Sequence, residues 1–202
     1  MFKNEYFSSP IYHEDKSEWV DKLDNLCDPY IKTARSKHQI QDEVGAVYHS
    51  TRLHKDPEFN FFHDYVLNKS HWLLDDMGYD VNHYNLIFTE SWVQEFSFNG
   101  CGHHWFHTHS NNHVSGFYFL KSSPKTSKPM FQDPRVAHAA LKIKEKDEST
   151  ITNSNDFVHY QAPRGAFIFF PAYLSHSYKV DHGIEPFRFI HFNLRAVERD
   201  LN

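Results

Sequence analysis

The sequence predicts an α+β protein in which a pair of N-terminal helices packs on one sheet of a jelly roll. Two amphipathic helical stretches lie within residues 1–83, and about eight short strand candidates, separated by Gly, Pro and polar turns, follow in residues 84–202. Aromatic residues make up 17% of the chain, which favours strands and a large apolar interior. We therefore expect a single domain over residues 1–202, with a helical part at 1–83 and a jelly-roll core at 84–202.

The ends of both helices can be read from the sequence. The first helix is expected to begin after Asp15, which has capping-box spacing with Glu18. Its apolar residues recur at steps of three and four: Trp19, Leu23, Leu26, Cys27, Tyr30 and Ile31. The second begins at the Asp-Pro-Glu sequence at 56–58 and ends near Gly78, a residue type typical of C-terminal caps. The polar segment 35–54 between them is expected to be a loop.

From residue 84 the apolar period changes to two. Residues 84–100 alternate, which predicts one long strand or a pair of strands ending at Asn99-Gly100. Shorter apolar runs at 113–120, 129–135, 157–163, 165–171, 175–180 and 186–196 predict the remaining strands. The polar segments 121–128 and 142–156 are expected to be loops.

Composition narrows the class of protein. The formal net charge of −5 argues against an extensive nucleic-acid-binding surface. The two cysteines are far apart in sequence and form no Cys-x-x-Cys motif, so we expect no disulfide framework. No apolar run approaches the roughly 18 residues of a membrane span, and the N-terminus lacks the apolar core of a signal peptide. We expect a soluble cytoplasmic protein without a membrane partner, with a homodimer as its candidate assembly.

Two histidines, His107 and His109, stand two residues apart just before an aromatic strand. Side chains at i and i+2 of an extended chain point to the same face, so both imidazoles can bind one metal ion. The best candidate for a third ligand is His176, in the sequence GAFIFFPAYLSHSYKV. Imidazole ligands suit Fe, Zn, Cu or Ni better than Mg or Ca, and we predict iron. The alternative is an exposed pair that arises by chance, because the chain has 17 histidines.

Three protein ligands leave three positions of an octahedral iron open, enough for a bidentate 2-oxo acid and dioxygen. The far carboxylate of such an acid needs a cation, and Arg188, twelve residues after His176, is the candidate because its planar fork matches a carboxylate. Alternatively, Arg188 pairs with Glu185 or another acid at the surface. Tyr118 could donate its hydroxyl to the co-substrate, but packing in the aromatic core is the interpretation we favour.

The order of these motifs resembles the 2-oxoglutarate/Fe(II)-dependent oxygenases, and most of all a small group found in bacterial and phage genomes. The resemblance covers residues 84–196 and rests on H-x-H followed by SGFYFL, then FQDPR, then G-x5-P-x4-H, then an arginine strand ending in Phe-Asn. It implies a double-stranded β-helix, ferrous iron, and the use of 2-oxoglutarate and O2 to oxidise, most simply to hydroxylate, an unknown small-molecule or protein substrate. It also implies that His107 and His176 bind iron and that Arg188 binds 2-oxoglutarate.

The chain departs from the family pattern at two places. His109 stands where the wider superfamily has Asp or Glu, so Asp133 in FQDPR is an alternative third ligand. The neighbouring histidines, which are expected at the rim of the site, could also replace His109: His103, His104 and His113. In addition, the arginine lies one position closer to Phe-Asn than usual, and a shift of one residue reverses the face of a strand.

Two other classes of function fit parts of the sequence. A cupin-type metal enzyme fits G-x5-P-x4-H loosely, but Tyr173 stands where a cupin has glycine, and SNNHVSG lacks the expected glutamate. A non-catalytic jelly-roll module could hold a structural ion, and its site would be closed by protein ligands.

Overall fold

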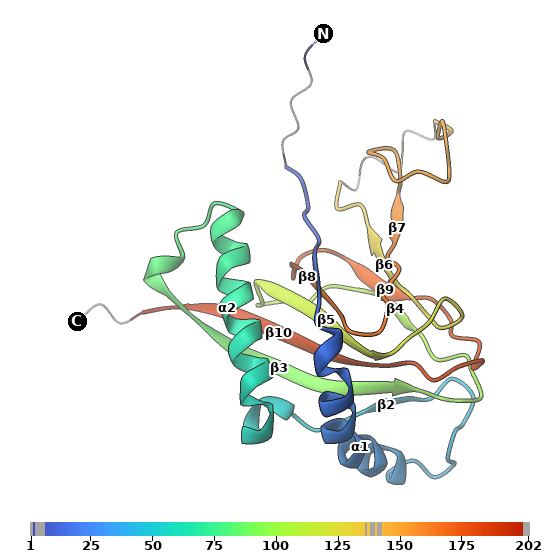
Figure 1. Cartoon of the computed structure of the whole chain (residues 1–202). Coiled ribbons are helices and arrows are strands. Elements are labelled where there is room, and N and C mark those ends of the chain that lie inside the picture. Colours follow the sequence, from blue (N-terminus) through green and yellow to red (C-terminus); the bar gives the residue numbers. More distant parts are fainter. Residues whose placement is uncertain (1, 3–6, 136, 138–139, 141–142, 200–202) are drawn as a thin grey trace.

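The computed structural model describes residues 1–202 except 1, 3–6, 136, 138–139, 141–142 and 200–202. In this part of the chain two α-helices, α1 (Val20–Ser36) and α2 (Asn60–Asp76), lie against one face of a large antiparallel sheet (Figure 1). Single 3-10 turns occur at Ser17–Trp19, Leu53–Lys55, Pro57–Phe59 and Val81–His83. None of the described helices is long and apolar enough to cross a membrane.

The described strands form two sheets in which every pairing is antiparallel. The larger sheet has the order β1 (Tyr12–Asp15), β8 (Ala166–Pro171), β5 (Val114–Lys121), β10 (Arg188–Glu198), β3 (Tyr84–Phe96) and β2 (Val47–His49). The smaller sheet has the order β4 (His104–His107), β9 (His176–Tyr178), β6 (Pro129–Gln132) and β7 (Phe157–His159). The chain is thus a mixed protein of two helices and antiparallel sheets.

The larger sheet separates two apolar cores. The first lies between this sheet and the helices, and includes Leu23, Phe62, Val66, Tyr118, Ile190 and Phe192. The second lies between the two sheets, and includes Phe96, Phe117, Phe119, Phe131, Tyr178 and Phe189. Successive side chains of a strand point to opposite faces. Position along β5 and β10 therefore decides whether a side chain faces the helices or the second sheet.

The predicted helix starts are confirmed only in part, because a 3-10 turn precedes each α-helix and only the turn Pro57–Phe59 has a side-chain N-cap, Asp56. The carboxylate of Asp15 accepts a hydrogen bond from the Ser17 amide at 2.7 Å, and that of Asp56 accepts one from the Glu58 amide at 3.0 Å. Gly78 has a φ of +90° just after α2, and its amide donates to the Asp75 carbonyl. A left-handed backbone at this point is what glycine allows at little cost.

One predicted loop is wrong in part. Segment 35–54 contains β2, which pairs with β3 through Val47 and Phe96, and its end overlaps the 3-10 turn Leu53–Lys55. Three residues are too few for a visible alternation, and this strand forms only because β3 offers it a pairing edge. The alternating stretch that begins at residue 84 forms the single strand β3.

Candidate metal centre

Three histidines converge where the smaller sheet meets the loop that leads into β5. His107 ends β4, His176 begins β9, and the two residues are direct partners in the antiparallel pairing of these strands. His109 lies two residues beyond the end of β4. The ligand nitrogens of all three lie within 4.8 Å of one another. Strand pairing therefore brings together residues that are almost seventy positions apart in sequence.

Hydrogen bonds to the backbone fix how two of these rings are oriented. Nδ1 of His107 lies 2.7 Å from the Trp105 carbonyl oxygen, and Nδ1 of His176 lies 3.0 Å from the Leu174 carbonyl oxygen. A carbonyl oxygen only accepts, so each Nδ1 carries the proton and each Nε2 presents a lone pair. Nε2 of His109 lies 3.3 Å from Nε2 of His176.

The residues present fit a bound divalent transition metal. Metal–imidazole bonds of about 2.0–2.1 Å place neighbouring nitrogens roughly 3.0–3.4 Å apart, close to the His109–His176 separation. Burial lowers the pKa of His109 to about 4 and that of His176 to about 3. For His176 the hydrogen bond to Leu174 opposes this shift without cancelling it. Both rings are therefore neutral at pH 7, the state that a metal requires.

Buried polar side chains around Asn193 contact Nδ1 of His109, the ring nitrogen that does not face His176. The Asn193 side chain is buried, and its amide nitrogen donates to Glu90 Oε2 at 2.6 Å. The same nitrogen lies 3.1 Å from His109 Nδ1 and 2.9 Å from His191 Nε2, while Ser115 donates to the Asn193 oxygen. Glu90, His109 and His191 form a second group of potential ligands within 4.8 Å. The Asn193 amide nitrogen contacts all three residues, so one side chain holds Glu90 and His191 beside His109.

A cavity of about 190 Å³ adjoins the three histidines. Besides them it is lined by His49, Trp92, Gln94, His104, Phe117, Tyr178, Phe189 and His191. His104 contacts Gln94 through Nε2 and Oε1 at 2.8 Å, and burial lowers the pKa of His104 to about 4. Burial also raises the pKa of the Tyr178 hydroxyl well above its ordinary value. Among the described lining residues there is no Lys, Arg, Asp or Glu, so the cavity offers neutral polar groups and aromatic surface.

The structure does not bring Arg188 to the histidines, because its side chain lies on the other face of the larger sheet. Its guanidinium donates to Glu95 at 2.6 Å and to two carboxylates of α1, Asp24 at 2.7 Å and Asp28 at 2.6 Å. On β10 it is Phe189, one residue further, that faces the cavity. The arginine pairs with acids, but not at the surface as the alternative interpretation held, since its side chain is buried and Glu185 contacts Lys125.

Tyr118 is also on the helix-facing side, so the structure does not bring it to the histidines. Its hydroxyl donates to the Lys16 carbonyl oxygen at 2.7 Å, and its ring packs against Phe62 and Phe167. Core packing, the simpler use, is the one that the structure shows. On β5 the cavity-facing neighbour is Phe117.

The other candidate ligands lie apart from the three converging nitrogens. The Asp133 carboxylate contacts Arg135 at 2.6 Å and belongs to neither described group of potential ligands. His103 contacts the Cys101 carbonyl, and Nδ1 of His113 accepts from the Ala196 amide. His104 does line the cavity.

Several residues around the site were not predicted, although their regular spacing on two strands is visible in the sequence. Glu90, Trp92 and Gln94 alternate along β3, and His191 and Asn193 share one face of β10. The sequence does not show which face of each strand lies next to the histidines, because that depends on the strand pairings.

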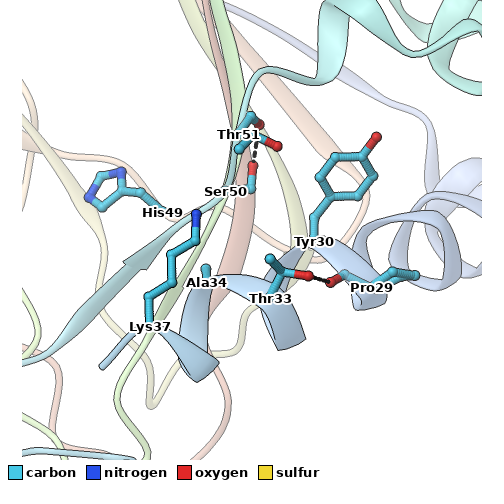
Figure 2. A pocket seen from close by; sticks show the side chains of 8 residues that line it. All are labelled: Pro29, Tyr30, Thr33, Ala34, Lys37, His49, Ser50 and Thr51. Carbon is cyan, nitrogen blue, oxygen red and sulfur yellow. Dashed lines mark hydrogen bonds between the residues drawn. The ribbon is translucent and has the colours of Figure 1, made fainter. Parts of the chain in front are cut away.

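A separate surface pocket of about 200 Å³ lies between the second half of α1 and β2 (Figure 2). It is lined by Pro29, Tyr30, Thr33, Ala34, Lys37, His49, Ser50 and Thr51. His49 is shared with the histidine cavity, so this side chain forms part of the wall of both.

Comparison with known proteins decides between the classes of function. Residues 90–193 match a family model described as "Putative 2OG-Fe(II) oxygenase", a match that runs from Glu90 to Asn193 and spans half of the chain. The chain belongs to the 2OG-Fe(II) oxygenase family. Enzymes of this family use Fe(II), 2-oxoglutarate and O2. Membership supports an oxygenase over a cupin-type enzyme or a binding module, and it leaves the second substrate unknown.

Several solved structures share the fold. A prolyl-4-hydroxylase from Pseudomonas putida is similar with a TM-score of 0.60 at 9% identity, over 93% of this chain and 94% of that one. AviO1 from Streptomyces viridochromogenes gives 0.66 at 11% identity, over 93% and 90%. HygX from Streptomyces hygroscopicus, solved with nickel and 2-oxoglutarate, gives 0.59 at 9% identity, over 93% and 83%. No curated protein matches the sequence.

Proposed function

We propose that His107, His109 and His176 hold ferrous iron in an enzyme that hydroxylates a second substrate. In this reaction 2-oxoglutarate and O2 are consumed, succinate and CO2 are released, and one oxygen atom enters a C–H bond of the substrate. The observation that carries the proposal is the convergence of three imidazole nitrogens, two of them on rings whose Nδ1–H is held by a backbone carbonyl. Asp133, which contacts Arg135, is not a ligand in this proposal.

Bound iron would supply the redox chemistry that activates O2, and the chain supplies position and shielding. Three protein ligands leave open coordination positions, which distinguishes a catalytic site from a closed structural one. His176 is fully buried, whereas His107 is exposed. The two rings thus define an inner side that adjoins the cavity and an outer side that a second substrate can reach.

The fold in this proposal is a double-stranded β-helix, and residues 1–202 form one domain. Two antiparallel sheets that face each other across an aromatic core support the first statement. Packing of α1 and α2 against the same sheet that carries β3, β5 and β10 supports the second.

The test is iron-dependent succinate formation. Purified protein is loaded with Fe(II) without oxygen, given 2-oxoglutarate and then O2, and succinate is measured by mass spectrometry. We expect slow turnover in the wild type even without a second substrate, and none after His176→Ala. The exposed His182 provides a control, and His182→Ala should keep wild-type turnover. Absence of 2-oxoglutarate binding to iron-loaded wild type would overturn the proposal.

A further inference from the structure

Because Arg188 lies away from the histidines, another group must bind the far carboxylate of 2-oxoglutarate. The arginine is held by Glu95, Asp24 and Asp28 on the opposite side of the larger sheet. The cavity beside the histidines is large enough for an organic acid, since one water needs only about 10–15 Å³ and the cavity has about 190 Å³. The described residues give this cavity no cationic Lys or Arg side chain.

Two hydrogen-bond donors of the cavity lining have no partner. The Tyr178 side chain is 4% exposed, and its hydroxyl makes no hydrogen bond. The indole nitrogen of Trp92 is likewise buried and without a partner. Buried polar groups in folded proteins nearly always have a partner, so these two donors are available to a molecule bound in the cavity. Both groups donate, which means that the ligand must accept.

The two donors come from opposite walls of the same cavity. Tyr178 lies on β9 of the smaller sheet, two residues beyond His176 and on the same face of that strand. Trp92 lies on β3 of the larger sheet, and its ring stacks on His191 with centroids 4.9 Å apart. Tyr178 is also stacked, on Phe189 at 4.6 Å. Rigid aromatic neighbours hold both donors in place before any ligand arrives.

The charge of bound 2-oxoglutarate can be balanced without an arginine in the cavity. Ferrous iron held by three neutral histidines has a net charge of +2, which equals the charge of the 2-oxoglutarate dianion with opposite sign. Where a carboxylate is one of the ligands, a further cation is needed to reach the same balance. His109 in the carboxylate position thus makes a neutral carboxylate pocket electrostatically sufficient.

We propose that the Tyr178 hydroxyl and the Trp92 indole N–H bind the far carboxylate of 2-oxoglutarate, in the role first expected of Arg188. This inference rests on the proposed function, because it assumes that the histidines hold iron. It extends that function by naming the groups that select a five-carbon dicarboxylic oxo acid over a shorter or uncharged one.

The experiment compares two co-substrates on iron-loaded protein without oxygen. Binding of 2-oxoglutarate is measured by calorimetry beside binding of 2-oxopentanoate, which has the same chain but a methyl group in place of the far carboxylate. Tyr178→Phe and Trp92→Phe should each weaken 2-oxoglutarate binding about tenfold or more, the usual effect of losing a hydrogen bond to a charged group. Binding of 2-oxopentanoate should change little.

Tyr118→Phe is the matched control. It also removes one hydroxyl from a buried tyrosine, but on the helix-facing side, where Lys16 is the partner. Its 2-oxoglutarate affinity should equal that of wild type, and iron content and melting temperature are measured for every variant. The inference is overturned if Tyr178→Phe and Trp92→Phe bind 2-oxoglutarate normally, or if both acids are weakened equally. If a variant does not fold, the wild type still tests the inference. Equal affinity of the wild type for 2-oxoglutarate and 2-oxopentanoate would overturn it.

A wild type that binds neither acid would point to a different failure. In that case the proposed function itself falls, because chelation of the oxo acid by iron needs neither Tyr178 nor Trp92. The two failures can therefore be told apart.

Discussion

Nε2 of His109 and Nε2 of His176 lie 3.3 Å apart, although the two residues are separated by 67 positions in sequence. Burial lowers the pKa of both rings, so neither is charged at neutral pH. Without a metal, one ring can donate to the other through this contact. A metal between them replaces that hydrogen bond with two coordinate bonds, so this pair is where ligand substitutions are most informative.

Removal of His109 should abolish tight iron binding, whereas a carboxylate in its place should preserve it. His109→Ala loses a ligand and is expected to weaken iron binding by more than tenfold, since losing even an outer partner costs about 10–100-fold. His109→Asp supplies an anionic oxygen ligand and should retain iron. Iron content after anaerobic loading and dialysis measures both. His113→Ala is the control, because His113 contacts the Ala196 amide; iron loss in that variant, and not in His109→Ala, would identify a different ligand.

Arg188 is expected to matter for stability. Its side chain and that of Glu95 are 5% and 1% exposed, so removal of the arginine leaves a buried carboxylate with less compensation. Arg188→Met should lower the free energy of unfolding by about 3–5 kcal/mol, measured by urea denaturation. Arg188→Met combined with Glu95→Gln should lose less than the sum of the two single variants. A stable Arg188→Met protein that fails to bind 2-oxoglutarate would restore the binding role of this residue.

Gly116 in the SGFYFL motif is a packing requirement. A Cβ at this position would lie 2.5 Å from the Ile168 carbonyl oxygen and 2.3 Å from Cζ of the buried Phe192. We expect Gly116→Ala to lower the unfolding free energy by about 1–3 kcal/mol, as overpacking does. Phe192→Leu in the same chain should relieve part of this clash. Strictly additive losses in the double variant would contradict the explanation.

The free energy of unfolding should decrease as the pH is lowered, in part because of His63, a buried histidine of α2. His63 is buried, with Nε2 3.1 Å from the Ser91 hydroxyl, and its burial, assisted by the nearby His54, lowers its pKa to about 4. Between pH 6.5 and 4 the unfolded chain binds a proton at this residue that the folded chain does not. The free energy of unfolding therefore decreases as pH falls through this window, by up to about 3 kcal/mol.

The measurement is urea denaturation of metal-free protein from pH 7.5 to pH 4, with His63→Gln compared with His182→Gln. The His63 variant should show a shallower loss of stability with falling pH, and the variant at the exposed His182 should follow the wild type. Identical pH profiles for wild type and His63→Gln would show that this histidine is not the cause.

Local chemistry in the sequence was sufficient for the helices and for most strands. Asp15, Asp56 and Gly78 act through neighbours within a few residues, so their roles can be read without the fold. The long alternation of β3 and the H-x-H spacing are also local signals. The oxygenase family follows from motif order and is confirmed by the match over residues 90–193. The expected homodimer and the absence of an extensive nucleic-acid surface stay predictions.

What the tertiary structure decided is which face each strand turns to the histidines. A change of one residue in register reverses the face of a strand, so Arg188 and Tyr118 point to the helices while their neighbours Phe189 and Phe117 point to the cavity. Burial does not mark this choice, because both faces of β5 and of residues 188–194 of β10 are buried. The sequence alone indicates which kinds of side chain could bind iron. Which of these side chains lie close together depends on the pairing of β4 with β9 and of β10 with β3 and β5. Strand pairing joins residues far apart in the chain, and only the folded sheet fixes its register.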